Sequence, residues 1–466
     1  MANTNGSILN SIATELEVVR PVIEEINAAD NDQLVGRVKK VAQTERISRY
    51  LYRWPAETQI GGNSQKIDAN GGGVLPKGTQ LVQIKLLAGY YTGSIGFVLT
   101  DEQTKVITSQ QAVTDIAARQ MSMAQVAENS YDDVDFHQDG TGILTNPSSA
   151  VVGGSNATMT FASATDFRGI NMLFEGMAVA VWDSTGANER AAATGAPIII
   201  IAIDYDAKKV TLNQDVTSLT AGDIIARRGM ANYGPSTLTS FNSTYPGTVG
   251  AAAGGIGGDS WRHGFPYWVN TTTSNYFYSQ LKSTYPQLNA VRVNANNDTL
   301  QWEQGLRLIA KIQQKRPKKE VWKDLEGIAH QTQRAACFEL GMSISQNFLQ
   351  GKSFGESLDL VPTNQANTDK FNFANIPCNV STRYDRDKIA FINFNKIGIV
   401  EAAPTGPYTR GPGEGAAFFE GRDSSSGSPM TYFEWFLQSW FEFVCFEAGS
   451  CGIVDTLAQP SAVWDA

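Results

Sequence analysis

The sequence predicts an α+β fold organised around one long helix. Three observations lead to this prediction: helical periodicity in residues 107–146, strand-like alternation in 48–100, and a shift to small and β-branched residues in 147–232. Helices and strands that occupy separate stretches of a chain, instead of alternating regularly, are typical of this class. The chain has 466 residues, which is enough for about two to four domains or subdomains.

The long helix, here called the spine helix, is predicted from about Ser109 to about Phe136 within the segment 101–146. Thr108 and Ser109 are suited to cap its N-terminus. Small or apolar residues then recur every three or four positions, which places them on one side of a helix. At about 1.5 Å per residue the helix would span roughly 40 Å, which is long for a globular domain. The positions are Val113, Ile116, Ala117, Met123, Ala124, Ala127, Tyr131 and Val134.

An acidic stretch containing glycine follows the spine helix. Asp133, Asp135, His137 and Asp139 alternate there, and all four side chains are potential metal ligands. The glycine does not fall where an EF-hand loop requires it, and no glutamate follows at the position that binds calcium with both oxygens. We therefore interpret the stretch as a capped helix end followed by a turn.

Two different segments precede the spine helix. Residues 1–47 form an N-terminal arm with apolar residues at helical spacing and too little core of its own to be independent. In 48–100, alternating aromatic and polar residues lead to a polar tip at 61–73 and back through a second alternating stretch beyond Leu81. This pattern predicts an extended β-hairpin. Residues 71–73 are three glycines, but no Gly-Lys-Ser/Thr follows them, so a phosphate-binding loop is not expected.

After the spine helix, the segment 147–232 predicts a small all-β domain inserted into the main fold. The segment 233–425 reads as a mixed region with one helix ended by Pro317 and a second from about Glu320 to about Phe348. Strands are expected near 389–394 and 397–400, and a Gly/Pro loop at 405–415. The segment 426–466 holds a long strand, about 431–446, and a short apolar tail at 452–457. One side of the first helix is expected to carry Leu300, Leu306, Ile309 and Ile312. One side of the second helix is expected to carry Trp322, Leu325, Ile328, Ala329, Ala336, Leu340 and Ile344.

The mixed region begins with two patterns that suggest ligand binding. Residues 254–258 are rich in glycine, but no strand precedes them, so a dinucleotide fingerprint is not expected. An aromatic cluster follows. Its interpretation is a core or intersubunit anchor, with a sugar-binding platform as the alternative. The cluster consists of Trp261, Phe265, Tyr267 and Trp268.

The charge and composition of the chain favour some classes of function over others. The formal net charge is −9, and charged residues make up 18% of the chain, below the roughly 25% of average proteins. Such a chain suits a protein that buries much of its surface against neighbours. It does not suit one that binds nucleic acid by neutralising phosphates. The basic run 315–319 is interpreted as a solvated helix end. No secretory signal and no membrane span are expected.

No catalytic, cofactor-binding or metal-binding residue is predicted. The three histidines, at 137, 263 and 330, belong to no zinc or hydrolase motif. A carboxylate pair would need no histidine, but the sequence does not single out Glu326, Glu339 or Glu356. The four cysteines are expected to be free buried thiols, because the C-x5-C spacing of the last two matches no common zinc pattern. They are Cys337, Cys378, Cys445 and Cys451.

In its order of elements, most of the chain resembles the major capsid proteins of tailed bacteriophages, which share the Hong Kong 97 fold. Residues 137–142, His-Gln-Asp-Gly-Thr-Gly, are similar to the Gly-Asp-Gly-Thr-Gly stretch that often follows the spine helix in that family, with Gln138 where glycine is usual. Residues 176–179 and 221–224 look like the β insertion of some members. The tail 452–457 is similar to a common C-terminal ending.

The resemblance implies a shell subunit that self-assembles into hexamers and pentamers of an icosahedral head enclosing double-stranded DNA. The hairpin would be the extended loop that overlaps a neighbour. The spine helix and last strand would form the peripheral domain, and the region near 235–425 the axial domain. Some members crosslink a loop lysine to a neighbour's asparagine; Lys66 and Lys77 lie in or beside the tip, but neither can be paired, and no bond is predicted.

The resemblance further implies location in the virion shell after assembly in the host cytoplasm, without cofactors. The implied partners are copies of the chain, portal, scaffolding and decoration proteins, and packaged DNA through weak non-specific contact. No membrane partner is implied. The alternative is a secreted or surface β-rich module that binds glycans through the aromatic cluster. An enzyme with an unrecognised carboxylate pair is the third hypothesis.

Overall fold

The computed structural model describes about half of the chain as separate stretches. These are residues 43–46, 51–59, 82–89, 91–100, 127–140, 142–151, 157–161, 170–184, 188–192, 197–205, 207–227, 262–273, 276–278, 280–315, 324–348, 370–374, 376–407, 419–422 and 429–458. The hairpin tip, the spine helix before residue 127, the glycine-rich 254–258, Trp261 and most of the N-terminal arm lie outside them. The chain divides into two compact units. The first contains 1–35, 92–133 and 403–440, and the second 36–91, 134–402 and 441–466.

Five strands form one sheet, in the order β1-β19-β21-β20 with β4 also paired to β21. The strands are β1 (Gln43–Arg46), β4 (Tyr91–Thr100), β19 (Ile397–Pro407), β20 (Phe419–Arg422) and β21 (Pro429–Cys445). In the first unit, β20 runs antiparallel to β21, with Phe419 opposite Glu434. In the second, β1 runs parallel to β19, with Gln43 opposite Gly398. The predicted long strand of 431–446 is confirmed, and residues 43–46, at the end of the arm, form a strand.

The predicted Gly/Pro loop at 405–415 is partly wrong, because β19 continues to Pro407. The last described residue of β19 that pairs with β1 is Glu401, opposite Arg46, and Pro404 and Pro407 lie beyond it. In sheets, proline is confined to positions where no ladder hydrogen bond needs its N–H.

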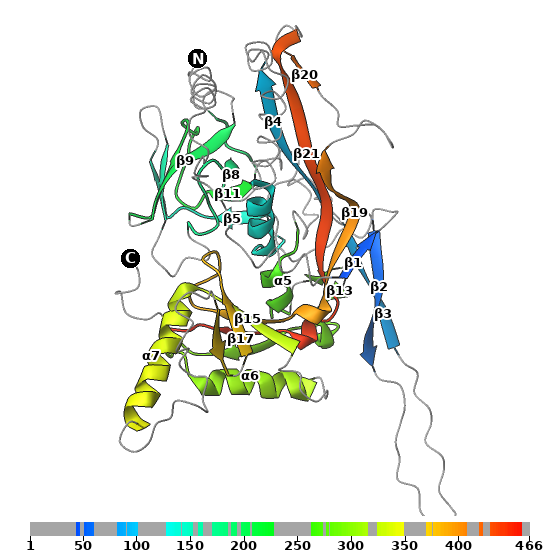
Figure 1. Cartoon of the computed structure of the whole chain (residues 1–466), viewed down its shortest axis with the longest axis vertical. Coiled ribbons are helices and arrows are strands. Elements are labelled where there is room, and N and C mark those ends of the chain that lie inside the picture. Colours follow the sequence, from blue (N-terminus) through cyan, green and yellow to red (C-terminus); the bar gives the residue numbers. More distant parts are fainter. Residues whose placement is uncertain are drawn as a thin grey trace, which may run out of the picture. The chain divides into compact units, whose positions relative to one another are not determined.

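The predicted hairpin of 48–100 is confirmed for residues 51–59 and 82–89, whereas residues 91–100 form β4 and pair with β21 instead. In the second unit, β2 (Leu51–Gln59) and β3 (Val82–Gly89) pair antiparallel, with Leu51 opposite Gly89 and Gln59 opposite Val82 (Figure 1). They form a two-stranded sheet that is not paired with the other sheets. Alternation divides the side chains between two faces, as expected for strands. Trp54, Ile84, Leu86 and Ala88 are buried, whereas Arg53, Pro55, Gln83 and Lys85 are exposed.

Strands from residues 143–227 form a seven-stranded sheet of their own, in the order β5-β11-β8-β9-β10-β7-β6. They are β5 (Ile143–Thr145), β6 (Ser149–Val151), β7 (Thr158–Thr160), β8 (Ala178–Trp182), β9 (Ile198–Asp204), β10 (Lys209–Leu212) and β11 (Ile224–Arg227). Neighbouring strands of this sheet pair antiparallel, and β9 turns into β10 with Asp204 opposite Lys209. Two glycines with positive φ, Gly176 and Gly222, make the turns that lead into β8 and β11.

A six-stranded mixed sheet lies against the helix α6 (Trp302–Lys315), and α7 (Gln331–Phe348) follows its strand β15 (Figure 1). The sheet order is β14-β22-β18-β15-β17-β16. The strands are β14 (Val291–Asn294), β15 (Leu325–Ala329), β16 (Lys370–Phe373), β17 (Ile376–Val380), β18 (Ile389–Asn393) and β22 (Gly452–Asp455). The short elements around it are α5 (Phe265–Val269), β12 (Tyr276–Phe277), β13 (Gln280–Leu281), η2 (Pro286–Leu288), η4 (Phe394–Lys396) and η5 (Ala448–Ser450).

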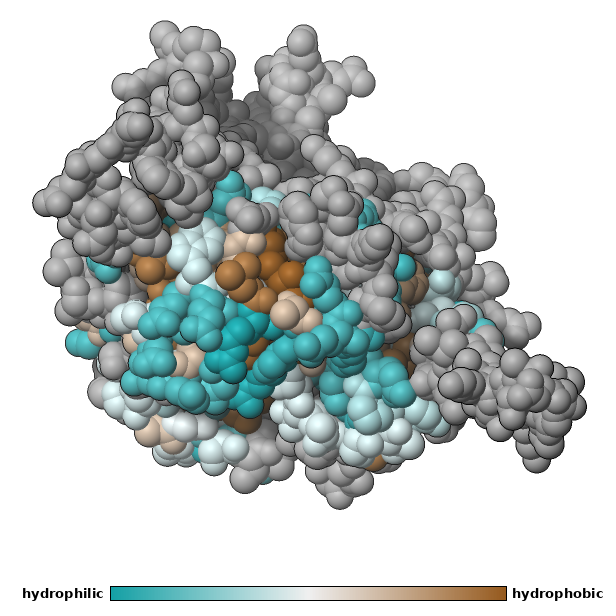
Figure 2. Space-filling view, turned by 90° about the horizontal axis from the view of Figure 1, so that it is seen from below, coloured by the Kyte–Doolittle hydropathy of each residue, from teal (hydrophilic) through white to brown (hydrophobic). Residues whose placement is uncertain are grey.

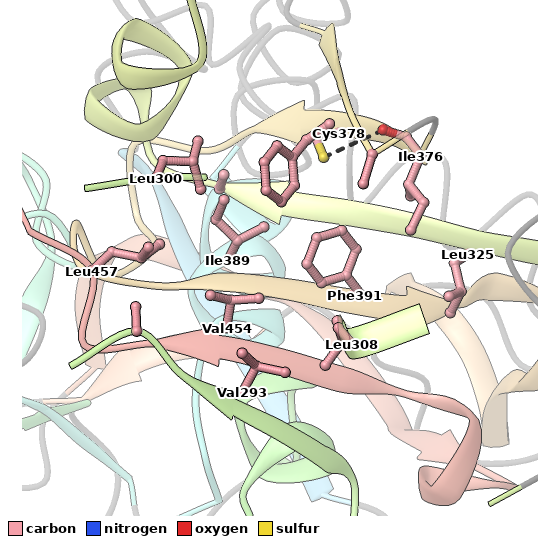
Figure 3. Packing of buried hydrophobic residues seen from close by; sticks show 14 of the residues in the cluster. Val293, Leu300, Leu308, Leu325, Ile376, Cys378, Ile389, Phe391, Val454 and Leu457 are labelled. Carbon is pink, nitrogen blue, oxygen red and sulfur yellow. Dashed lines mark hydrogen bonds between the residues drawn. The ribbon is translucent and has the colours of Figure 1, made fainter. Parts of the chain in front are cut away.

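Apolar side chains between this sheet and α6 form a large core cluster. Leu308 of α6, Val293 of β14, Phe391 of β18 and Val454 of β22 point toward one another, although they come from distant parts of the sequence (Figure 3). All four are essentially inaccessible to solvent. The tail predicted at 452–457 thus supplies a strand inside the sheet, between β14 and β18, instead of a peripheral ending.

The helix predicted from about Glu320 to Phe348 is wrong in its first part. Residues 325–329 form β15, which pairs with β18 on one side and β17 on the other. The sheet buries Leu325, Ile328 and Ala329, which were expected on the apolar side of a helix. Gly327 fits this place because a Cβ there would lie 2.3 Å from the Cys378 sulfur on β17. A short apolar run is compatible with a helix or with a buried strand, and pairing with the neighbouring strands makes it a strand here.

Helix α6 also differs in its buried side. Leu306, expected in the apolar stripe, is 56% exposed, whereas Gln304, Gly305, Leu308 and Ile312 are buried. Gly305 allows the close approach of Phe373 and Ala374, since a Cβ there would lie within 3 Å of both side chains. Seen from below, on the side of α6, hydrophilic residues form a broad band (Figure 2). In the part of the chain that is described, none of the helices has the length and apolar character needed to cross a membrane.

Candidate functional site

The residues after the spine helix lie at a buried junction in the second unit. The described helix ends at Phe136, and His137 and Gln138 donate backbone hydrogen bonds to the carbonyls of Val134 and Asp135. The chain then turns at Gly140, whose φ of +82° favours glycine. Asp139 forms an isolated antiparallel bridge with His263. The predicted capped helix end and turn is therefore confirmed, and it is held by a segment more than a hundred residues away.

Asp135 is the charged centre of this junction. Its carboxylate accepts hydrogen bonds from Arg227, at the end of β11, and from Arg262, before α5, and all three side chains are nearly or fully buried. The Arg262 guanidinium also stacks on Phe441 of β21, 3.9 Å from the ring centre. One buried carboxylate thus accepts hydrogen bonds from two buried guanidiniums, so its loss would remove an ionic partner from each of them.

A contact between a histidine and a carboxylate lies beside the Asp135 ion pairs. Glu442 of β21 accepts a hydrogen bond from the His263 backbone N–H at 2.8 Å, and its Oε1 lies 3.3 Å from Nδ1 of the same histidine. Burial raises the pKa of Glu442, while His263 and Arg262 act in the opposite direction. The pair connects β21 to the segment that also contacts the helix end. Together, the contacts of Asp135 with its two arginines and of Glu442 with His263 join four segments that are distant in sequence.

The backbone at the junction is packed closely enough to require glycine. A Cβ at Gly264 would lie 2.0 Å from the carbonyl oxygen of Phe136, and a Cβ at Gly140 would lie 2.5 Å from the His263 ring. Gly264 has an ordinary φ of −84°, so the requirement there is space and not conformation. Its N–H donates to the carbonyl of Gln138 at 2.9 Å, which fixes the approach.

The aromatic cluster belongs to the core of the same junction. Phe265, Tyr267 and Trp268 of α5 are fully buried, and Phe136 and Phe443 pack against them or one another at ring distances of 5.3–5.8 Å. The Tyr278 hydroxyl accepts hydrogen bonds from Trp268 Nε1 and from the backbone N–H of Cys445. Burial raises its pKa well above the ordinary value. Because these rings are inaccessible, the core interpretation is confirmed for them, and a sugar-binding platform is excluded.

The base of the β2–β3 hairpin contacts this region. The Trp54 ring packs edge-on against Tyr278, 5.0 Å between centres, and against Phe446, 5.9 Å between centres. Tyr52 stacks on Trp54. The Gln280 amide donates to the carbonyl of Lys85 at 3.1 Å. These contacts hold the hairpin at the end opposite its tip.

Solved structures provide a further comparison. The chain resembles solved phage capsid structures along nearly its whole length. The cyanophage A-1(L) capsid asymmetric unit is 13% identical, with 97% of this chain and 99% of that chain covered and a TM-score of 0.47. The capsid of a native GTA particle is 7% identical, with 95% and 93% covered and a TM-score of 0.38. The holo-SrpI encapsulin complex from Synechococcus elongatus PCC 7942 is 7% identical, with 96% and 95% covered and a TM-score of 0.40.

No protein-family model and no curated protein matches this sequence.

The candidate metal ligands after the spine helix have separate partners. Asp135 binds the two arginines, whereas the His137 ring is hydrogen-bonded to the Ser381 hydroxyl at 2.7 Å. Asp139 faces His263 through its backbone bridge. Among the described residues, no group of three or more His, Cys, Asp or Glu side chains is arranged to hold a metal ion.

The remaining candidates have structural environments. His330 precedes α7 and accepts from the backbone N–H of Thr332, as a helix cap does. Glu326 accepts a hydrogen bond from Asn379. Lys315, the described residue of the basic run, donates to the carbonyls of Pro286 and Asn289. Glu356, Lys66 and Lys77 lie outside the described residues. All four cysteines are free thiols, and Cys337 is only partly buried.

Arg227, Arg262 and Glu442 are the site residues that sequence reasoning missed. A signal exists for two of them, since Arg262 and Glu442 each stand within an aromatic run where a charge is unusual. A charged residue in such a run must be paired if the run is buried. Its partner is set by the fold, and no local pattern indicates it.

Proposed function

We propose that this chain is the major shell subunit of a tailed-bacteriophage head, assembling with its own copies into hexamers and pentamers around double-stranded DNA. The observation that carries the proposal is the β2–β3 hairpin. Among the described strands it forms a two-stranded sheet of its own, anchored by Trp54 at its open end, and residues 60–81 connect Gln59 to Val82 in sequence. A two-stranded ribbon is marginal in water unless something packs on it. A neighbouring copy would supply that packing on the exposed face of Arg53 and Lys85.

The proposal assigns a role to each segment. The arm 1–47 docks on a neighbour, and 48–100 is the extended loop. The spine segment 101–146 and the returning segment 426–466 form the peripheral domain, and 233–425 contributes the axial domain with parts of the peripheral one. The segment 147–232 is an inserted β domain, supported by the seven-stranded sheet that its residues build with β5. The proposed location is the virion shell, after assembly in the host cytoplasm.

The proposed partners follow from the same assignment. Copies of the chain are the main partners, with portal, scaffolding and decoration proteins at restricted positions. The net charge of −9 supports only weak, non-specific contact with packaged DNA, because an acidic wall repels phosphates instead of binding them. The glycan-binding alternative loses its support, since the three described aromatic rings proposed to stack on sugars are buried.

The test is the assembly state of the full chain. Negative-stain microscopy and light scattering of the purified protein should show closed shells or hexamers and pentamers. Many weak contacts multiply when copies assemble, so particles should form above a threshold concentration. A compact monomer at high concentration would overturn the proposal.

A hairpin variant separates assembly from folding. Replacing 60–81 by Asn-Gly joins Gln59 to Val82, which already face each other, through a two-residue turn suited to such a pair. This variant should keep the circular dichroism spectrum and thermal midpoint of the parent but lose shell formation. Shells that form equally well without 60–81 would contradict the role assigned to the hairpin.

A further inference from the structure

The last two cysteines lie at the two ends of a short turn in the second unit. Cys445 ends β21, η5 (Ala448–Ser450) reverses the chain, and Cys451 precedes β22. The turn is closed by backbone hydrogen bonds from Ser450 to Glu447 and from Cys451 to Ala448, at 3.0 and 2.9 Å. The two sulfur-bearing residues are therefore six positions apart in sequence but brought together by a fixed reversal.

Both cysteine backbones are held by other parts of the fold. The Cys445 N–H donates to the Tyr278 hydroxyl at 3.0 Å, and the Cys451 carbonyl accepts from Val291 N–H at 3.0 Å. Both side chains are completely buried. The thiol of Cys445 is hydrogen-bonded to the sulfur of Cys451, and this contact lowers the pKa of Cys451. A thiol with a lowered pKa is the better nucleophile of a pair, because the thiolate is the reactive form.

We propose that Cys445 and Cys451 form a reversible disulfide that ties the end of β21 to the start of β22. The bond would join the longest described strand to a strand inside the six-stranded sheet. The inference rests on the facing thiols and the closed turn, and it holds whether or not the chain forms a shell. In reducing surroundings the pair stays as two thiols, which is the state of the structure.

The oxidant is a peroxide or another small two-electron acceptor. Hydrogen peroxide oxidises the Cys451 thiolate to a sulfenic acid with loss of hydroxide. The Cys445 thiol attacks that sulfur, the S–S bond forms, and the sulfenic oxygen leaves as water. Two thiols and one peroxide thus give one disulfide and two waters. A small oxidant is required because both sulfurs are buried.

The sequence makes the product simple to detect. No Lys or Arg follows Arg422, so trypsin releases residues 423–466 as one peptide that carries Cys445 and Cys451 and no other cysteine. The full chain is treated with hydrogen peroxide, denatured, alkylated and digested for mass spectrometry. The expected peptide lacks both alkyl groups and two hydrogens. Cleavage after Glu447 then leaves the two halves linked until a reductant is added.

Controls distinguish pairing from general oxidation. Cys378 is equally buried but donates to the Ile376 carbonyl at 3.6 Å (Figure 3), and it should remain alkylatable. The variants C445S and C451S should each leave one alkylatable thiol. The oxidised parent should unfold at a temperature higher by ~2–4 °C, a gain reversed by dithiothreitol and absent from both variants. Full alkylation of both cysteines after oxidation, or separate sulfinic acids at each, would overturn the proposal. Storage in air without reductant gives the same test if peroxide unfolds the protein.

Discussion

Arg262 donates from Nη1 to Oδ2 of Asp135 at 2.9 Å, although 127 positions separate the two residues. Arg227 reaches the same oxygen from the end of the seven-stranded sheet. One carboxylate therefore fixes the end of the spine helix to two later segments. Because the three side chains are buried, their hydrogen bonds are not exchanged for contacts with water, and the junction depends on all of them.

The variant D135N should destabilise the protein strongly. The amide has the shape of the carboxylate but no charge, so each of two buried guanidiniums loses an ionic partner, a loss of about 3–5 kcal/mol. The midpoint of urea unfolding, followed by tryptophan fluorescence, should fall accordingly. The matched control is D455N, which removes the partner of the half-exposed Arg292 and should cost less than about 1 kcal/mol. Equal shifts in the two variants would contradict the proposed importance of the junction.

The variant G264A should prevent the native packing of the helix end. The added methyl would lie 2.0 Å from the Phe136 carbonyl oxygen, and two backbones would have to separate to accept it. We expect insoluble protein or a large loss of thermal stability. G222A is the control, because its φ of +83° is strained but nothing lies within 4 Å of the new methyl. That variant should lose only about 1–2 kcal/mol, and a milder effect of G264A than of G222A would refute the close approach.

The variant K282M should remove a pH dependence of stability. Lys282 is buried, and burial together with the nearby Lys315 lowers its pKa from 10.5 to about 7. Between these values the unfolded chain binds a proton that the folded chain does not, so the lysine makes stability fall as pH decreases from about 10.5 to about 7. Below about pH 7 the full penalty is present. The methionine variant should therefore gain thermal midpoint over the parent at about pH 6 and lose that advantage at about pH 10. A gain that grows with pH would have the wrong sign.

The variant W54A should loosen the hairpin at its base. The indole fills the space between Tyr278 and Phe446, and its removal should cost about 3–5 kcal/mol, as for other buried tryptophans. Limited proteolysis should then cut the hairpin faster. R53A, on the exposed face one residue earlier, should leave the rate of proteolysis unchanged. Similar cutting rates in both variants would contradict the anchoring by Trp54.

Local sequence patterns are sufficient to predict the structure of segments in which the alternation of residue types reflects which side chains are buried. The strands of the hairpin and the long strand β21 were predicted closely, because every second residue of an exposed or half-buried strand must change character. The turn after Phe136 was predicted from its glycine and acidic residues. The interpretation of the aromatic cluster as a core or intersubunit anchor is confirmed for the core by the burial of Phe265, Tyr267 and Trp268.

Contacts between segments distant in sequence determine the structure where local patterns do not. The same apolar spacing that suggested a helix at 325–329 belongs to a strand, because β17 and β18 flank it and satisfy its backbone hydrogen bonds. Leu306 is apolar yet exposed, because Gly305 lets α6 lie with another side against the sheet.

By itself, the sequence determined the low charge, the extended hairpin, the long returning strand and the glycine turn after the helix, since each depends on neighbouring residues. Only the tertiary structure decided that Asp135 meets Arg227 and Arg262, that His263 meets Glu442, and that the tail runs inside a sheet. The physical reason is that a buried charge or strand must find a partner, and the partner's identity is a property of how distant segments fold together.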